Sequence, residues 1–290
     1  MKIHDVSKNY GKIRALDKVS IAFGKGVHGL LGENGAGKTT LMRVITTVIE
    51  QDSGTIEHDG VSWDNKDEVR KMIGYLPQKF SLYKQLTVRE SLRHIAILKG
   101  MEDGWKREVD NAIKEVNLEE KADSRIGELS GGMVRRLGIA QAVLGNPEII
   151  VVDEPTAGLD PEERMRFRLL LRRIGVGKTI ILSTHIVDDV EAICDNLTIL
   201  HKGKVIITGT PNEIKSMAKG KIWRTSLSRD DYMKLVEGKL ITDQKIEDEF
   251  YDIRFMSDES PDIKAIPVEP KLEEAYMWLL KIRTECEKQF

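Results

Sequence analysis

The chain has 290 residues, and its 45 lysines and arginines against 47 aspartates and glutamates give a formal net charge of −2. This balance gives no electrostatic case for nucleic-acid binding, which favours a basic face, and 40% apolar residues argue against disorder. The longest apolar run, residues 275–280, is far shorter than the ~20 residues of a membrane-spanning helix, and the polar first residues contain no signal-peptide core. Two cysteines, Cys194 and Cys286, cannot form a disulfide framework, which fits a reducing compartment. The composition therefore predicts a globular cytosolic protein and leaves its function open.

Short β-branched and apolar runs alternate along the chain with longer helical patterns, which predicts an α/β protein with a largely parallel sheet. Residues 27–31 form the first run and lead into a glycine-rich turn, followed by a helical pattern over residues 39–49. Residues 149–152 are apolar without interruption, as expected for a strand buried on both faces. A third run at 179–182 and a hairpin at 197–207 complete the expected sheet.

Two further regions define the domain organisation. Residues 87–145 contain no strand-like run, so we expect an inserted helical subdomain that is helical throughout. A boundary near Gly220 is expected because the charge balance changes there: residues 221–290 hold 12 basic and 16 acidic residues. This region has its own strand-like alternation at 251–255 and helical spacing at 272–280. The chain is thus predicted to divide into residues 1–220 and an accessory region, residues 221–290, whose role the sequence leaves open.

Residues 32–39 read Gly-Glu-Asn-Gly-Ala-Gly-Lys-Thr and match the phosphate-loop pattern G-x-x-x-x-G-K-[ST] between a predicted strand and a predicted helix. Glycines let backbone N–H groups point inward at a phosphate chain, and the positive end of the helix dipole adds to this attraction. Lys38 is expected to neutralise β- and γ-phosphate oxygens, and the Thr39 hydroxyl to bind Mg²⁺. The motif predicts a nucleoside triphosphate site, but alone it does not separate GTPases, kinases, motors and transport ATPases.

Two acidic residues follow the predicted strand at 149–152. Asp153, at the carboxyl end of the strand and beside the phosphate loop, is predicted to hold Mg²⁺ directly or through water. If the strand geometry continues, Glu154 points to the opposite side, toward the γ-phosphate and a water molecule. Glu154 is therefore the candidate general base, or water-orienting residue, for hydrolysis.

A second glycine-rich segment, Leu129-Ser130-Gly131-Gly132-Met133, precedes an amphipathic helical pattern. Ser130, Gly131 and Gly132 offer a hydroxyl and accessible N–H groups at a helix N-terminus, which makes a second anion site. One phosphate loop and two anion-binding helix starts indicate a head-to-tail pair of chains, each completing the nucleotide site of the other. The Ser-Gly-Gly segment taken alone would instead favour an ordinary capped helix.

Together these segments resemble the nucleotide-binding subunit of ATP-binding cassette (ABC) transporters. Residues 32–39 resemble the Walker A loop, 129–133 the signature motif and 149–154 the Walker B strand. The remaining family motifs have counterparts in the Q-loop at 75–78, the D-loop at 157–160 and the switch-histidine segment at 183–185. Two departures, Met133 for the common Gln and Glu33 for a Pro, remove no catalytic group. The resemblance implies a P-loop NTPase core of the RecA type with an antiparallel β subdomain, an inserted helical subdomain and a small C-terminal α+β extension.

The resemblance also assigns roles to individual residues. It implies that Gln78 reaches the metal and the attacking water, that His185 donates to the γ-phosphate, and that Asp160 meets the opposite subunit. The implied catalytic residues are thus Glu154, His185 and Gln78, and the implied metal ligands are Thr39, Gln78 and Asp153. The implied nucleotide contacts are Tyr10, which would stack on adenine, Gly32, Asn34, Gly35, Gly37, Lys38, Thr39, Thr40, Ser130, Gly131, Gly132 and Asp160.

As a whole, the resemblance implies an ATPase that uses ATP and Mg²⁺, and that forms an ATP-dependent head-to-tail homodimer or a heterodimer with a similar subunit. It would drive transport through separate transmembrane permease subunits, with residues 78–86 forming a groove for a short permease helix and no nucleic-acid partner. Met133 and the C-terminal helix resemble those of export systems. The resemblance also implies a cytoplasmic chain that is held on the inner face of the cell membrane by a permease subunit. The alternative is a soluble ABC ATPase that remodels a cytosolic partner in iron–sulfur assembly or translation control. A third interpretation, a regulatory ATP switch, is disfavoured by the intact Glu154 and His185.

Overall fold

Strand β7 (Ile149–Asp153) is buried along its whole length, as its unbroken apolar sequence predicts. The computed structural model describes residues 1–101, 103–236, 239–247, 250–261 and 264–288. In it, β7 pairs in parallel with both neighbours in a six-stranded sheet of order β10-β9-β3-β8-β7-β6. The other strands are Lys204–Gly209 (β10), Asn196–His201 (β9), Gly26–Leu31 (β3), Thr179–Thr184 (β8) and Ile73–Leu76 (β6). The strands predicted from the sequence are confirmed, and β6 is an additional one.

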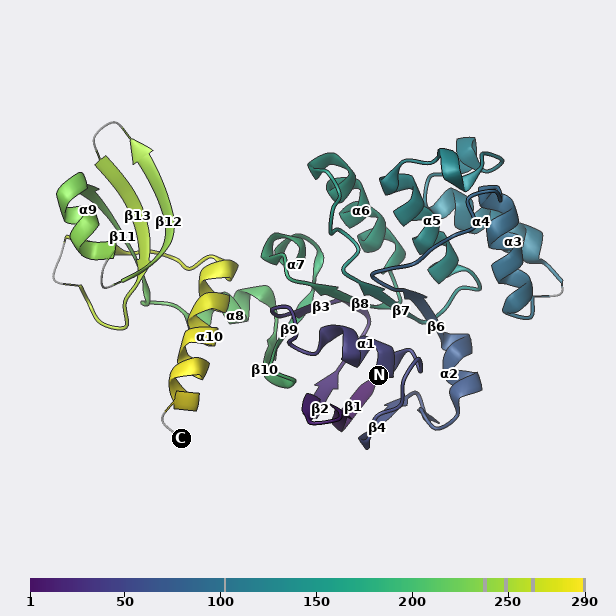
Figure 1. Ribbon diagram of the computed structural model, residues 1–290, viewed down its shortest axis with the longest axis horizontal. Coiled ribbons are helices and arrows are strands. Elements are labelled where there is room, and N and C mark those ends of the chain that lie inside the picture. Colours follow the sequence, from purple (N-terminus) through teal and green to yellow (C-terminus); the bar gives the residue numbers. More distant parts are fainter. Residues whose placement is uncertain (102, 237–238, 248–249, 262–263, 289–290) are drawn as a thin grey trace. The chain divides into compact units, whose positions relative to one another are not determined.

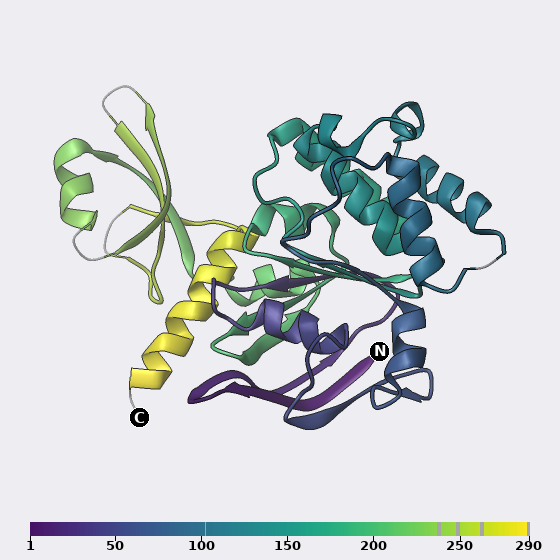
Figure 2. The ribbon, with the colours of Figure 1, turned by 45° about the vertical axis from the view of Figure 1, so that its right-hand side comes forward.

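A second, antiparallel sheet has the order β2-β1-β4-β5 and contains Ile13–Ala22 (β2), Lys2–Tyr10 (β1), Ser53–His58 (β4) and Val61–Ser62 (β5). Helix α1 (Lys38–Ile45) lies between the two sheets, where its apolar side chains share one core with residues of β1, β2 and β7 (Figures 1 and 2). Helices α6 (Pro161–Ile174) and α7 (Val187–Ile193) cover the other face of the parallel sheet.

Helix α1 is shorter than the predicted span of residues 39–49. The Thr46 hydroxyl donates to the Met42 carbonyl (2.8 Å), and Thr47 adopts a left-handed backbone (φ 56°). Because a left-handed residue cannot continue a right-handed helix, α1 ends at Ile45. Cys194 follows α7 and is buried and unpaired, whereas the side chain of Cys286 lies outside the described residues.

The region predicted to be helical contains α3 (Val88–Leu98), α4 (Trp105–Glu115) and α5 (Gly131–Val143). It is not helical throughout: two short 3₁₀ turns, Glu119–Lys121 and Ile126–Glu128, connect α4 to α5, and Thr87 pairs with Arg125 in an isolated bridge. Thr87 also forms a reciprocal capping box with Glu90 at the start of α3. Helix α2 (Lys66–Met72) precedes β6. Within the described part of the chain, the helices lack the combination of length and apolar character that crossing a bilayer requires.

Residue contacts divide the chain into a first unit, Met1–Thr208, and a second unit, Gly209–Phe290. This division precedes the charge change near Gly220, so α8 (Pro211–Met217) belongs to the second unit. The second unit has a sheet of order β12-β13-β11-β14, made of Leu240–Glu247, Phe250–Met256, Ile222–Ser228 and Ile266–Pro267. Helices α9 (Arg229–Val236) and α10 (Leu272–Lys288) complete it, with α10 packed beside α8. The strand and the helix predicted in this region are confirmed.

The second unit also contains a buried ion pair. Glu274 is 2% exposed, and its carboxylate accepts hydrogen bonds from Arg254 Nε (2.7 Å), from the Thr242 hydroxyl (2.9 Å) and from the Lys271 amide (2.7 Å). Burial by itself would raise the pKa of Glu274, but these hydrogen bonds outweigh it and hold the pKa below its ordinary value. The ionised Glu274 therefore stabilises the fold fully at a pH above its ordinary pKa, and this stabilisation is lost as the pH falls through the lowered pKa of the folded state.

Replacing Arg254 with Met should destabilise the second unit by about 3–5 kcal/mol, because it leaves the buried Glu274 carboxylate without its cation. Urea unfolding of the full chain, followed by tryptophan fluorescence, measures the effect. Lys271→Met is the matched control, because the Lys271–Asp243 ion pair is about half exposed and should contribute at most about 1 kcal/mol. Equal destabilisation by the two variants would contradict a special contribution from the buried pair.

Candidate functional site

The loop between β3 and α1 wraps around a buried lysine. Gly35 (φ 83°) and Gly37 (φ 105°) adopt the left-handed backbone that glycine tolerates best. A Cβ atom at Gly37 would also lie only 2.6 Å from the Ala15 carbonyl oxygen. Lys38 Nζ donates to the carbonyl oxygens of Gly32 (2.6 Å) and Glu33 (3.1 Å). The loop therefore holds an ammonium group at the N-terminus of α1, where the helix dipole already favours an anion.

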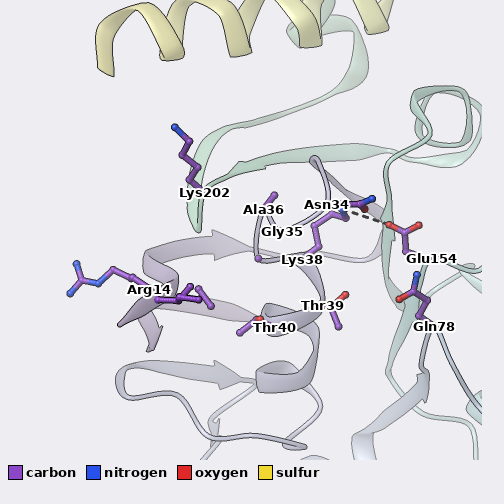
Figure 3. A pocket seen from close by; sticks show the side chains of 13 residues that line it. Arg14, Asn34, Gly35, Ala36, Lys38, Thr39, Thr40, Gln78, Glu154 and Lys202 are labelled. Atoms are coloured by element: carbon purple, nitrogen blue, oxygen red, sulfur yellow. Dashed lines mark ion pairs between the residues drawn. The ribbon is translucent and has the colours of Figure 1, made fainter. Parts of the chain in front are cut away.

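Two carboxylates lie near this ammonium group. Glu154 Oε1 is 3.6 Å from Lys38 Nζ (Figure 3). Burial lowers the pKa of Lys38, while Glu154 and Asp153 oppose the shift. Strand β7 ends at Asp153, and Glu154 has a left-handed backbone (φ 48°), so the strand alternation expected to orient Glu154 does not continue. Glu154 faces Lys38 because the chain turns out of the strand at this residue.

His185 follows strand β8, and its Nδ1 atom lies 2.6 Å from Glu154 Oε2. The Glu154 side chain is 7% exposed, whereas that of His185 is 47% exposed. Glu154 is thus held between a buried cation on one oxygen and a half-exposed imidazole on the other. A carboxylate fixed in this way can take a proton from a correctly placed water molecule.

Asp153 offers a carboxylate oxygen suited to a cation. Its Oδ1 atom accepts hydrogen bonds from the Ser183 hydroxyl (2.5 Å) and the Thr39 hydroxyl (3.4 Å). Its Oδ2 atom is buried and has no hydrogen-bond partner among the described residues. Such an unpaired buried oxygen is costly unless an ion or water satisfies it, and carboxylate and hydroxyl oxygens are ligands that Mg²⁺ prefers. The donor set therefore fits Mg²⁺.

The loop and Glu154 line a pocket of about 390 Å³ (Figure 3). Half of the expected nucleotide contacts and two of the expected catalytic residues line it: Asn34, Gly35, Gly37, Lys38, Thr39, Thr40, Gln78 and Glu154. Asp153 and His185 are joined to this set by the contacts above, and Gly32 by its carbonyl oxygen. Tyr10 is 46% exposed at the end of β1 and does not line the pocket, although the β1–β2 hairpin supplies Ile13, Arg14 and Ala15 to it.

Arg14 and Lys202 are basic pocket residues that the sequence motifs do not predict, and both lie near turns of hairpins. In Figure 3 they lie on the side of the pocket away from Gln78 and Glu154. Lys202 has a left-handed backbone (φ 47°), and the next residue, Gly203, donates its N–H to the Ala36 carbonyl (2.9 Å). The Lys-Gly pair between two predicted strands signals a turn, but only the fold shows that this turn is bonded to the phosphate loop.

The signature and D-loop residues do not line this pocket. Ser130 caps α5 by accepting the Met133 N–H (3.2 Å), and Asp160 caps α6 by accepting the Glu163 N–H (2.9 Å). Apart from Gly131 itself, its two chain neighbours and the backbone of its own helix, no atom of the described chain lies within 4 Å of the Cβ position at Gly131. A single chain therefore brings together the Walker residues and Gln78, and leaves the start of α5 outside the pocket that they form.

Comparison with known proteins identifies the family. The ABC transporter profile matches residues 16–157. Over 216 residues the chain is 40% identical to the "Nod factor export ATP-binding protein I" of Rhizobium sp. (strain N33), covering 72% of this chain and 70% of that protein. The chain belongs to the ABC transporter family. This ABC chain is also similar to the "Linearmycin resistance ATP-binding protein LnrL" of Bacillus subtilis (strain 168), with 34% identity over 224 residues that cover 76% of the chain and 72% of LnrL.

Solved ABC structures have the same fold. The "ATP binding subunit of ABC transporter" superposes with a TM-score of 0.66 at 31% identity, covering 74% of this chain and 92% of that one. The dimeric "MJ0796, a Bacterial ABC Transporter Cassette" superposes with a TM-score of 0.64 at 28% identity, and the match covers 72% of this chain and 97% of that one. The predicted P-loop fold is thus confirmed, and the ABC chain is an ATP-binding and ATP-hydrolysing subunit of a membrane transporter. ABC ATPases of this kind form dimers and act with transmembrane partners.

Proposed function

We propose that the chain is the ATPase subunit of an exporter, that it works as a head-to-tail dimer, and that it drives separate transmembrane subunits from the cytoplasmic face of the membrane. Export is supported by the names of two relatives, one for Nod factor export and one for linearmycin resistance. The same relatives disfavour the alternative of a soluble ATPase that remodels a cytosolic partner. The observation that carries the proposal is the cluster of Lys38, Glu154 and His185 beside the unpaired Asp153 oxygen.

The phosphate loop binds the triphosphate in this proposal. Its N–H groups and the N-terminus of α1 face the phosphate oxygens, and Lys38 exchanges its carbonyl partners for the β- and γ-phosphates. Thr39, Asp153 and Gln78 would hold Mg²⁺, which supplies charge neutralisation at the phosphates when bound. Thr39 and Asp153 are already in contact, which supports their joint role.

Glu154 accepts the proton of the attacking water in the hydrolysis step. Its two oxygens are fixed by Lys38 and His185, so little reorganisation is needed at the moment of reaction. His185 keeps Glu154 oriented through Nδ1, and its other ring nitrogen donates to the γ-phosphate. The His185 side chain is 47% exposed, so a bound partner chain can also contact it.

The second chain supplies Ser130, Gly131 and Gly132 to the triphosphate. These residues form the N-terminal turn of α5, so their hydroxyl and N–H groups suit an anion. They lie outside the pocket of their own chain, and the open space at Gly131 leaves room for a partner. Asp160 is the last residue of the D-loop and the N-cap of α6, and it is proposed to meet the opposite chain.

A groove beside the nucleotide pocket is proposed to receive a short helix of a transmembrane subunit. Its volume is about 590 Å³, and its lining combines apolar with basic residues, including Phe80, Leu82, Ile126, Leu129, Val134 and Arg135. The Arg135 guanidinium lies 5.7 Å from the centre of the Phe80 ring and donates to the Gln78 carbonyl (3.1 Å). Because Gln78 lines both the groove and the nucleotide pocket, movement at one can reach the other.

Replacing Leu82 with Asp should abolish binding to the transmembrane subunit while leaving basal ATP hydrolysis within about twofold, because a carboxylate added to the apolar part of the lining is costly only when the groove is covered. Co-purification with a polytopic partner from detergent-solubilised membranes measures the binding. Val176→Asp is the control, because Val176 is 80% exposed and lies outside the groove lining. Recovery of unchanged chain with soluble partners alone would overturn the transporter proposal, and normal co-purification of Leu82→Asp would exclude the groove as the docking site.

A further inference from the structure

Ser183 joins the two acidic residues of the nucleotide site through one hydroxyl group. It is fully buried near the end of β8, directly opposite Asp153 in the parallel register with β7. The Ser183 hydroxyl donates to Asp153 Oδ1 (2.5 Å) and accepts the backbone N–H of Glu154 (3.0 Å). The Ser183 carbonyl lies 3.2 Å from the same N–H. The family resemblance assigns no role to this serine.

The contact with Asp153 decides which carboxylate oxygen is free. Thr39 and Ser183 both donate to Oδ1, so Oδ2 remains the buried oxygen without a hydrogen-bond partner. Without these two hydrogen bonds, the Asp153 side chain could rotate and offer either oxygen. Metal binding would then cost the conformational entropy of fixing that side chain. Hydrogen bonds of this kind to a metal ligand commonly fix its orientation and change metal affinity or activity by about 10–100-fold.

The contact with Glu154 stabilises an unusual backbone. A left-handed conformation costs a glutamate about 1 kcal/mol or more, so its surroundings must hold it in place. The Glu154 N–H is fixed by the hydroxyl and the carbonyl of Ser183, and this turn brings the Glu154 carboxylate to Lys38 and His185. Loss of the hydroxyl would free the turn at the residue where the proton transfer takes place.

We propose that Ser183 is a positioning residue for hydrolysis: its one hydroxyl orients Asp153 toward the metal and Glu154 toward the attacking water. The inference rests on the proposed roles of Asp153 and Glu154. A merely structural serine would affect stability when replaced, whereas a positioning residue changes the turnover number and the metal dependence separately from nucleotide affinity.

The test compares Ser183→Ala, Ser183→Thr and Ser183→Val. Threonine and valine have nearly the same shape, but only threonine retains the hydroxyl, so this pair separates hydrogen bonding from packing. Three quantities are measured on the full chain: kcat and KM for ATP hydrolysis, binding of a fluorescent ATP analogue in EDTA, and the Mg²⁺ concentration that half-saturates the Mg²⁺-dependent change in that binding.

We expect Ser183→Ala and Ser183→Val to lower kcat by about 10–100-fold and to raise the half-saturating Mg²⁺ concentration by about tenfold. Nucleotide binding in EDTA should stay within about twofold, and Ser183→Thr should restore both kcat and Mg²⁺ dependence toward those of the unchanged chain. Equal kcat and equal Mg²⁺ dependence for Thr and Val would overturn the proposal, as would normal values for Ala. Glu154→Gln, assayed in parallel, separates the proposed role of Glu154 from the proposed role of Ser183. If Glu154→Gln is inactive while the Ser183 variants are normal, only the proposal for Ser183 fails.

Discussion

Replacement of Glu154 with Gln is expected to slow ATP hydrolysis by about 10²–10⁴-fold while leaving ATP binding close to that of the unchanged chain. Glutamine keeps the size and the polar contacts of the side chain, but its amide cannot take a proton from water. It also removes a negative charge 3.6 Å from Lys38, so it does not weaken the attraction of this site for the triphosphate. Phosphate release at saturating ATP and Mg²⁺ measures the rate, and equilibrium nucleotide binding measures the affinity.

The same variant should accumulate as an ATP-bound dimer, because the step that separates the chains becomes slow. Size-exclusion chromatography with ATP and Mg²⁺ detects this dimer. Glu162→Gln is the matched control: it makes the same chemical change at a side chain that is 75% exposed on α6 and should leave the rate unchanged. Hydrolysis by Glu154→Gln at the rate of the unchanged chain would falsify the assignment of Glu154 as the base.

The parts of the fold that the sequence predicts are those specified by local patterns. The buried run in β7 marks a strand with both faces covered, and the phosphate-loop glycines mark the turn between β3 and α1. The predicted length of α1 is wrong, because the apolar spacing in the sequence continues past Thr46. The helix ends earlier, where the Thr46 hydroxyl donates to the Met42 carbonyl and Thr47 adopts a left-handed backbone. A hydrogen bond to the backbone of the preceding turn is not visible in periodicity.

The details of the site depend on pairings between distant segments. The apolar run predicts Asp153 at the end of β7, which the structure confirms, but the predicted orientation of Glu154 depends on strand alternation that stops one residue earlier. The parallel register between β7 and β8 sets Ser183 beside Asp153, and the turn at Lys202 reaches the pocket through Gly203. Neither follows from the local sequence. The role of the α5 start is not visible in one chain for a different reason: its proposed ligand is bound in the pocket of a second chain.

The head-to-tail arrangement can be decided by mixing two inactive variants. Lys38→Ala removes the ammonium of one pocket but leaves the α5 start of that chain intact. Gly131→Asp leaves the nucleotide pocket of its own chain intact and adds a carboxylate at the α5 start. The open space around Gly131 has room for this side chain without a clash in its own chain. A carboxylate there would repel the triphosphate bound by a partner. Each variant alone should therefore hydrolyse ATP at least about 100-fold more slowly than the unchanged chain, and only Gly131→Asp should still bind nucleotide as a monomer.

Mixing the two variants in equal amounts should restore ATP hydrolysis to about a quarter of the normal rate. Random association makes about half of the dimers mixed, and a mixed head-to-tail dimer has one site in which an intact pocket meets an intact α5 start. Gly24→Asp, made at another glycine with no atom within 4 Å of its Cβ position, is the control for an added carboxylate and should be active alone. If each chain instead completed its own site, no mixed dimer would contain a competent one, and the mixture would be as inactive as its components. The recovered rate thus reports directly whether the start of α5 acts on the pocket of the other chain.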